Sequence, residues 1–108
     1  MSDTQQRIDD LVKQNDVLLF MKGTASFPQC GFSGRAVQIL KACGVDAKAF
    51  KTVNVLEDDE IRAGIKDYSN WPTIPQLFVK GEFIGGSDIM MEMYESGELQ
   101  TMLGTSAA

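Results

Sequence analysis

Hydrophobic and polar positions alternate along the chain with two different spacings. In some stretches apolar residues recur three and four positions apart, which predicts amphipathic helices. In others they form short runs bounded by turn residues, which predict strands. We expect helices at residues 5–15, 30–44, 56–69 and from 88 onward. We expect strands at residues 17–21, 49–55, 76–79 and 82–84.

The order of these elements indicates an α/β fold. Helix and strand alternate through the first half, whereas the last two strands are joined through Lys80-Gly81, a typical tight turn of a hairpin. The run Val17–Met21 is apolar on both alternating faces, as expected for a central strand that is covered on both sides. We therefore predict a mixed four-stranded sheet with helices on both faces, in a single domain over residues 1–108 with its core at about 5–103.

Composition and charge narrow the class of protein. The 108 residues are 44% hydrophobic and 23% charged, which suits one globular domain with a core of its own. Ten Lys and Arg against 15 Asp and Glu give a net charge of −5, which argues against a nucleic-acid-binding surface. No apolar run approaches the ~20 residues that span a bilayer, and the first residues predict neither a secretory nor a transit signal. We expect a cytoplasmic protein without a membrane or nucleic-acid partner.

Candidate chemistry concentrates at Cys30, because the chain has two cysteines and no histidine. Cys30 follows a predicted strand and loop and begins a predicted helix. Unpaired N–H groups at a helix N-terminus favour a thiolate over a thiol, and Lys22 at the end of the strand adds a positive charge. We therefore expect Cys30 to be a nucleophile or a ligand for a soft metal. The alternative is a buried structural cysteine, which holds for most cysteines of such domains.

Neither Ser33 nor the second cysteine supplies a partner thiol for Cys30. Ser33 occupies the place of the resolving thiol of a Cys-x-x-Cys motif, and a hydroxyl cannot expel a bound thiol from a mixed disulfide. Cys43 lies 13 residues after Cys30, about 20 Å along a helix, whereas a disulfide needs Cα atoms within about 7 Å. We expect Cys43 to be a core residue.

Four motifs carry a resemblance to a known family: Met21-Lys22-Gly23-Thr24, Cys30-Gly31-Phe32-Ser33, Trp71-Pro72-Thr73-Ile74-Pro75-Gln76 and Gly85-Gly86-Ser87-Asp88. In this order and spacing they resemble the CGFS-type monothiol glutaredoxins of the single-domain, bacterial or organellar kind, over about residues 8–103. The resemblance implies a thioredoxin-like fold, a glutathione site and a role in storing, delivering and assembling [2Fe–2S] clusters. It also implies a homodimer bridged by the cluster, complexes with a BolA-like protein and delivery to apo iron–sulfur client proteins.

The cysteine count makes the implied dimer chemically sensible. A [2Fe–2S] cluster takes four thiolate-type ligands, and one chain offers Cys30 as its single well-placed cysteine. If glutathione supplies a second thiolate beside each Cys30, two chains and two glutathione molecules reach four. Two chains that each use both cysteines also reach four, but the distance to Cys43 excludes this unless the helix is broken.

The resemblance also implies which residues hold glutathione. Glutathione carries carboxylates, for which Lys22, Arg62 and Lys66 are the candidate cations, the last two on one helix face; the alternative is a solvated basic face. The further residues with an implied role are Phe32, Thr73, Ile74, Pro75, Gly86, Ser87 and Asp88.

Two of these segments have specific implied features. The family has a cis-proline at Pro75, with the backbone of Ile74 exposed for the cysteinyl part of glutathione; the alternative is a trans turn. The amides of Gly86-Ser87 would form a nest for the γ-glutamyl carboxylate, with Asp88 near the ammonium group; the alternative is a hairpin exit followed by a helix cap. The family commonly has Cys where this chain has Ser87, which removes a possible second thiol.

Three functions remain open from the sequence. The leading one is an iron–sulfur carrier with at most weak oxidoreductase activity. The second is a glutathione-dependent thiol–disulfide oxidoreductase that removes glutathione from proteins by a monothiol mechanism. The third is an adaptor that uses the fold only as an interaction surface, which gives no reason for the basic residues near Cys30. We expect the other aromatic residues, Trp71 and Phe27 among them, to pack in the core.

Overall fold

A mixed four-stranded sheet runs through the middle of the molecule. The computed structural model describes residues 2–46 and 48–104. The central strand β1 is parallel to β2 and antiparallel to β3, and β4 continues the sheet beyond β3, in the order β2-β1-β3-β4. The strands are β1 (Val17–Met21), β2 (Lys51–Asn54), β3 (Gln76–Val79) and β4 (Glu82–Gly85). The predicted mixed sheet is confirmed.

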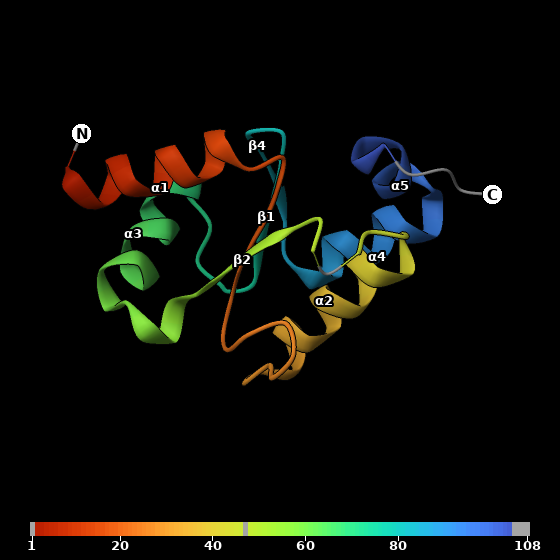
Figure 1. Ribbon diagram of the computed structural model, residues 1–108, viewed down its shortest axis with the longest axis horizontal. Coiled ribbons are helices and arrows are strands. Elements are labelled where there is room, and N and C mark those ends of the chain that lie inside the picture. Colours follow the sequence, from red (N-terminus) through yellow and green to blue (C-terminus); the bar gives the residue numbers. More distant parts are fainter. Residues whose placement is uncertain (1, 47, 105–108) are drawn as a thin grey trace.

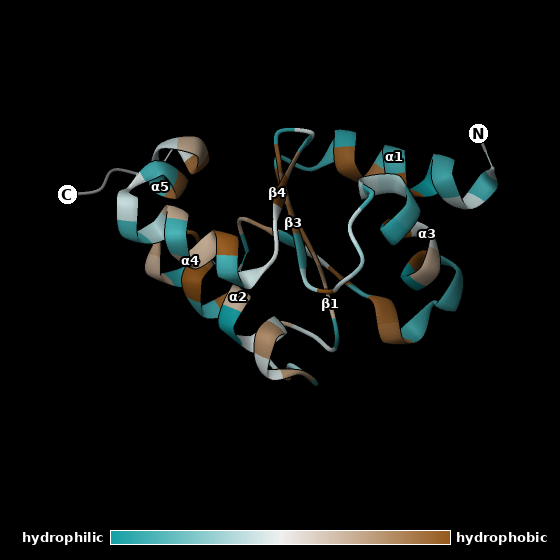
Figure 2. Cartoon of the chain, turned by 180° about the vertical axis from the view of Figure 1, so that it is seen from behind, coloured by the Kyte–Doolittle hydropathy of each residue, from teal (hydrophilic) through white to brown (hydrophobic). Residues whose placement is uncertain are grey.

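Helices cover both faces of this sheet (Figure 1, Figure 2). One face carries α1 and α3, and the other carries α2, α4 and α5. In Figure 2 the central strands β1 and β3 carry mostly hydrophobic colouring and lie between the two layers of helices. The helices are α1 (Asp3–Gln14), α2 (Gly31–Ala42), α3 (Asp59–Ser69), α4 (Ser87–Ser96), α5 (Glu98–Leu103) and the short 3-10 helix η1 (Val55–Glu57).

The strand β1 joins the two halves of the core. Successive side chains of a strand point to opposite faces of the sheet. Leu18 and Phe20 therefore pack in the cluster beneath α1 and α3, and Leu19 and Met21 in the cluster beneath α2, α4 and α5. All four are fully buried, which confirms the prediction of a central strand covered on both sides.

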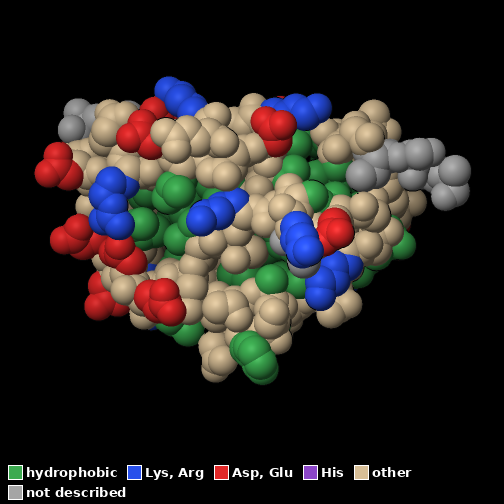
Figure 3. All heavy atoms as spheres, viewed as in Figure 1, with side chains coloured by type: hydrophobic (Ala, Val, Ile, Leu, Met, Phe, Trp, Pro, Cys, Tyr) green, Lys and Arg blue, Asp and Glu red, His purple; other side chains and the backbone are tan. Residues whose placement is uncertain are grey.

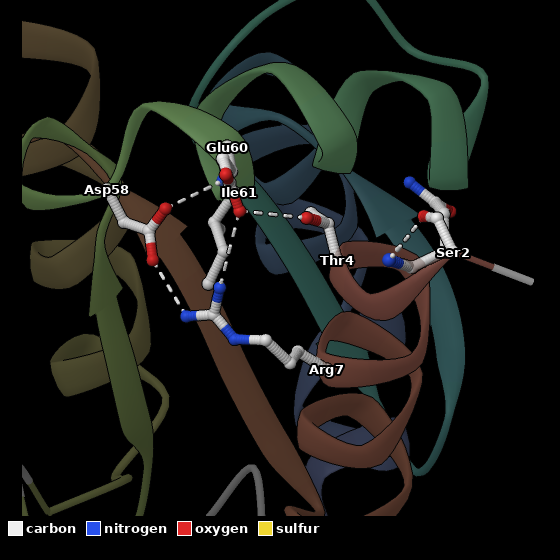
Figure 4. A network of polar contacts seen from close by, with 7 residues as sticks. Ser2, Thr4, Arg7, Asp58, Glu60 and Ile61 are labelled. Carbon is white, nitrogen blue, oxygen red and sulfur yellow. Dashed lines mark hydrogen bonds and ion pairs between the residues drawn. The ribbon is translucent and has the colours of Figure 1, made fainter.

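Polar contacts link α1 to the start of α3 (Figure 4). The guanidinium of Arg7 lies 2.7 Å from Asp58 Oδ2 and 4.0 Å from Glu60 Oε2. The hydroxyl of Thr4 donates to Glu60 Oε2 at 3.2 Å, and Asp58 Oδ1 caps α3 by accepting from the Ile61 N–H at 3.1 Å. Exposed ion pairs contribute little free energy each, so these contacts mainly set the orientation of α1 on α3.

Several element boundaries differ from the predicted ones by one to three residues, and three of the differences have a visible local cause. The second strand ends at Asn54 because the Asn54 side chain caps η1, accepting from the Leu56 N–H at 3.0 Å. The third helix begins only after the cap at Asp58. The last helix begins at Ser87 rather than at 88, and Gly97, with φ 84°, divides it into α4 and α5. That left-handed conformation is readily adopted by glycine and ends a helix.

The face shown in Figure 3 is unevenly charged. Asp and Glu side chains gather over the end of the molecule formed by α1 and α3. None of the helices in the described part of the chain combines the length and the apolar character needed to cross a membrane.

Helices α1 and α3 pack tightly against each other at Gly64. A Cβ atom at this position would lie 2.8 Å from Thr4 Cγ2 and 3.2 Å from Ile8 Cδ1, and Gln5 Nε2 donates to the Gly64 carbonyl oxygen at 2.8 Å. A side chain at Gly64 therefore has no space unless α1 moves away.

We predict that Gly64→Ala lowers the free energy of unfolding by about 1–3 kcal/mol, the usual cost of overpacking. Alanine in a free helix position would raise it by about 1 kcal/mol. Urea unfolding of Gly64→Ala, Thr4→Ala and the double variant measures the effect, and the double variant should recover part of the loss. A Gly64→Ala protein more stable than the wild type would contradict this packing.

Candidate functional site

A pocket of about 440 Å³ opens beside Cys30. This volume lies within the range of roughly 300–1,000 Å³ that is usual for small-molecule sites. Its walls come from three stretches that are far apart in the sequence, at residues 22–32, 66–75 and 86–89. The lining residues are Lys22, Cys30, Phe32, Lys66, Trp71, Pro72, Thr73, Ile74, Pro75, Gly86, Ser87, Asp88 and Ile89.

Cys30 is the half-buried N-cap residue of α2. The backbone N–H of Ser33 lowers the pKa of the Cys30 thiol most, since it favours the thiolate. Partial burial opposes this effect, while the Phe32 N–H, the Ser33 hydroxyl and the Lys22 ammonium group lower the pKa further. The helix N-terminus and Lys22 thus act on Cys30 in the direction that the sequence predicted.

The loop between β1 and α2 is held by several short hydrogen bonds. The Lys22 N–H donates to the buried Ser33 hydroxyl at 3.0 Å, and the Gly23 N–H donates to Asn54 Oδ1 at 2.9 Å. The Gln29 N–H donates back to the Lys22 carbonyl at 2.9 Å. Gly23 has φ 91°, and a Cβ there would lie 2.5 Å from the Phe27 carbonyl oxygen, so only glycine fits. The sequence did not predict that the Asn54 side chain, at the end of β2, would hold this loop by accepting from Gly23.

The segment between α3 and β3 forms a second wall. The Ile74–Pro75 peptide bond is cis, as the resemblance implied. The Trp71 N–H donates to the Lys66 carbonyl at 3.1 Å, which ties the start of the segment to the end of α3. The Trp71 ring rests on the ring of Phe83, with centroids 5.9 Å apart.

The third wall is the start of α4. Gly86 is the N-cap residue, Ser87 is buried, and Asp88 is an exposed first-turn residue. Asp88 Oδ1 lies 3.7 Å from Arg35 Nη1 of α2, so an ion pair connects the two helices at the rim of the pocket. Sequence reasoning missed Arg35, because its contact depends on how α2 and α4 pack.

The structure brings all predicted site residues to this pocket except Arg62. Arg62 lies one turn before Lys66 on α3 and is not among the lining residues. The lining residues that sequence reasoning missed are Trp71, Pro72 and Ile89. The position of Trp71-Pro72, directly before the predicted segment at Thr73, was a signal that could have identified two of them.

Two predictions about the remaining side chains have different outcomes. The expectation that the other aromatic residues pack in the core is confirmed for Phe20 and Phe78, which are buried, but is wrong for Trp71 and Phe27, whose exposed fractions are 39% and 74%. Phe27 lies in the loop between β1 and α2, and Trp71 lies in the segment between α3 and β3, so both belong to connecting segments at the surface. The expectation that Cys43 is a core residue is confirmed: Cys43 is 3% exposed at the far end of the unbroken helix α2, and burial raises the pKa of its thiol.

Comparison with known proteins identifies the family. The Glutaredoxin family model matches residues 17–84. The chain belongs to the glutaredoxin family. This glutaredoxin is 59% identical over 106 residues to a monothiol glutaredoxin (ycf64-like) of Synechocystis sp. strain PCC 6803, covering 98% of the chain and 96% of the relative.

Two solved structures extend this comparison. Reduced poplar apo GrxS14 has a TM-score of 0.78 and 51% identity, with 93% of this glutaredoxin and 89% of that chain covered. A buckwheat glutaredoxin in complex with glutathione has a TM-score of 0.81 and 27% identity, with 94% and 87% covered. The thioredoxin-like fold and the monothiol assignment are therefore established.

We predict that the Cys30 thiol titrates below the pKa of about 8.5 of a free cysteine. Carbamidomethylation rates measured against pH by mass spectrometry should give this midpoint, and Lys22→Met should raise it because one stabilising positive charge is lost. Buried Cys43 should react far more slowly in the same samples and serves as an internal control. A Cys30 midpoint at or above that of a free cysteine would contradict the electrostatics of the site.

Proposed function

We propose that this glutaredoxin binds glutathione beside Cys30 and, with a second copy of itself, holds and transfers a [2Fe–2S] cluster. One observation carries the proposal: a thiol of lowered pKa stands at the wall of a pocket large enough for a small molecule. An external thiol bound in this pocket would lie beside Cys30. The related buckwheat protein was solved as a glutathione complex, which supports the choice of ligand.

The lining of the pocket matches the charges of glutathione. Lys22 and Lys66 offer ammonium groups for its two carboxylates, and Asp88 offers a carboxylate for its ammonium group. The N-cap at Gly86 places the first amides of α4 toward the same pocket, and such amides favour an anionic group. The Ile74 backbone beside cis-Pro75 lines the pocket as well and suits an extended peptide.

The number of sulfur donors supports sharing between two chains. Four thiolates complete a [2Fe–2S] cluster, and the chain has one other cysteine, which is buried about 20 Å away along α2. Within residues 2–46 and 48–104, no group of three or more His, Cys, Asp or Glu side chains is placed to hold a metal ion. Two Cys30 thiolates and two glutathione thiolates supply the four donors.

The surface around Cys30 also favours contact with a second chain. Phe32 is 58% exposed and Phe27, in the preceding loop, is 74% exposed. Exposed aromatic residues of this kind are frequent anchors of protein contacts. A mixed complex with a BolA-like protein, delivery to apo iron–sulfur proteins and a cytoplasmic location remain predictions.

The lowered pKa of Cys30 also favours a second function, monothiol deglutathionylation. The Cys30 thiolate would attack the glutathione sulfur of a glutathionylated protein, form a Cys30–glutathione disulfide and release the protein thiolate. A second glutathione thiolate would then attack the glutathione sulfur of that disulfide, release oxidised glutathione and restore the Cys30 thiolate. Ser33 has no thiol for the intramolecular route, so free glutathione is the required reductant.

We predict that Lys66→Met weakens binding of reduced glutathione roughly two- to fivefold, the effect of losing one partly exposed ion pair. The matched variant Arg62→Met should bind as the wild type does, since Arg62 does not line the pocket. Titrations followed by NMR at two salt concentrations measure both. Equal losses of glutathione affinity in the two variants would contradict this prediction and would show that Arg62 also binds the ligand.

We predict that anaerobic reconstitution with iron and sulfide yields a coloured dimer when glutathione is present. Visible absorption and solution mass measure cluster content and assembly. Cys30→Ser should stay colourless and monomeric, because each dimer loses two of four sulfur ligands. Cys43→Ala should form the coloured dimer and serves as the matched control.

Two outcomes would overturn the carrier function. One is a wild-type protein that stays colourless and monomeric with glutathione. The other is equal cluster formation without glutathione, which would show that the four-thiolate count is wrong.

A further inference from the structure

Gln76 is a polar residue that is fully buried. It begins β3 and is 0% exposed, and the other three residues of β3 are all apolar. Its side-chain Nε2 donates two hydrogen bonds, to the carbonyl oxygens of Trp71 and Thr73, each at 3.1 Å. The amide of Gln76 therefore holds the backbone of residues 71–73 by hydrogen bonds from the buried side.

These two bonds hold the backbone of an exposed wall of the pocket. Trp71, Pro72 and Thr73 are all exposed, and the Trp71 ring packs on Phe83, a contact that leaves the backbone carbonyls of the segment to be held by hydrogen bonds. At one end the Trp71 N–H is bound to the Lys66 carbonyl, and at the other the chain enters β3. Between these ends, the Gln76 amide bonds the segment at Trp71 and Thr73, directly before Ile74.

Packing alone does not explain a glutamine at this position. Its Oε1 is buried and no donor of the described residues reaches it. A buried polar atom without a partner lowers stability, and an apolar side chain of the same size would avoid this penalty. The two donated hydrogen bonds are therefore what glutamine provides here and an apolar side chain cannot.

We propose that Gln76 is a positioning residue for the thiol ligand: it clamps residues 71–73 so that the Trp71 side chain and the Ile74 backbone face the glutathione site. Gln76 does not line the pocket, so it acts through this segment rather than by contact. The inference rests on the proposed function, because the ligand is glutathione. A segment held in its binding conformation loses less conformational freedom when the ligand binds.

Gln76→Met tests the clamp. Methionine keeps the length and volume of glutamine but donates no hydrogen bond. We expect the dissociation constant for reduced glutathione to rise about tenfold, as when bonds of this kind are lost. The melting temperature should stay within about 4 °C of the wild type, since the buried unpaired oxygen is removed as well. Leu77→Met is the matched control, because it alters the next core position of β3 and leaves the amide in place.

NMR reports on the segment without any ligand. In free Gln76→Met the backbone order parameters of Trp71 and Thr73 should fall, and the emission of Trp71, the one tryptophan of the chain, should shift to the red. Gln76→Leu, which also lacks the amide donors and suits a fully buried position, should show the same losses if the clamp is correct. This second variant keeps the test decisive if methionine fails to fold.

The possible results separate the clamp from the proposed function. Unchanged glutathione affinity and order parameters in both variants would overturn the inference, as would losses of affinity equal to those in Leu77→Met. If the wild type binds no glutathione, the proposed function fails. In that case lower order parameters in the two Gln76 variants would still support the clamp, and unchanged ones would remove it too.

Discussion

The hydrogen bond from the Lys22 N–H to the buried hydroxyl of Ser33 holds the end of β1 against the first turn of α2. Three residues before Ser33, Cys30 is the N-cap residue of the same helix, where the N–H groups of Ser33 and Phe32 stabilise a thiolate. The same bond brings Lys22 to the pocket wall. Ser33 therefore does more than stand in the place of a second thiol: its hydroxyl is part of the framework that places the first one.

The pocket forms at one end of the sheet because β1 and β3 run in opposite directions. Phe20, near the end of β1, pairs with Gln76, at the start of β3. The chain that leaves β1 and the chain that enters β3 consequently meet at the same end. Cys30 comes from the helix layer on one face and Lys66 from the layer on the other. The ends of the two central strands thus bring both layers to one site.

Local charge at the site differs from the charge of the whole protein. The net charge is −5, yet Lys22 and Lys66 both line the pocket. Many of the acidic side chains lie elsewhere, gathered over α1 and α3 (Figure 3). The net charge therefore predicts solubility better than it predicts what binds at Cys30.

The spacing of hydrophobic residues predicted the fold class, and the position of Cys30 before a helix predicted the residue of lowered thiol pKa. Both predictions succeed because they depend on local patterns along the chain. They also predicted the central strand, the hairpin and the burial of Cys43 at the far end of α2. Element boundaries at Asn54 and Gly97 depended on a side-chain cap and a backbone conformation that periodicity does not encode.

Only the tertiary structure decided which residues share the pocket. Lys66 lines it and Arg62 does not, although both were predicted on one helix face, because the pocket lies at the C-terminal end of α3, where Lys66 is one turn nearer to Trp71. Burial at Trp71 and Gln76 is the reverse of what their polarity suggests, because the aromatic Trp71 is exposed and the amide of Gln76 is buried. Such contacts join positions that only the folded chain brings together, so the sequence determined the chemistry at Cys30 and the packing determined its surroundings.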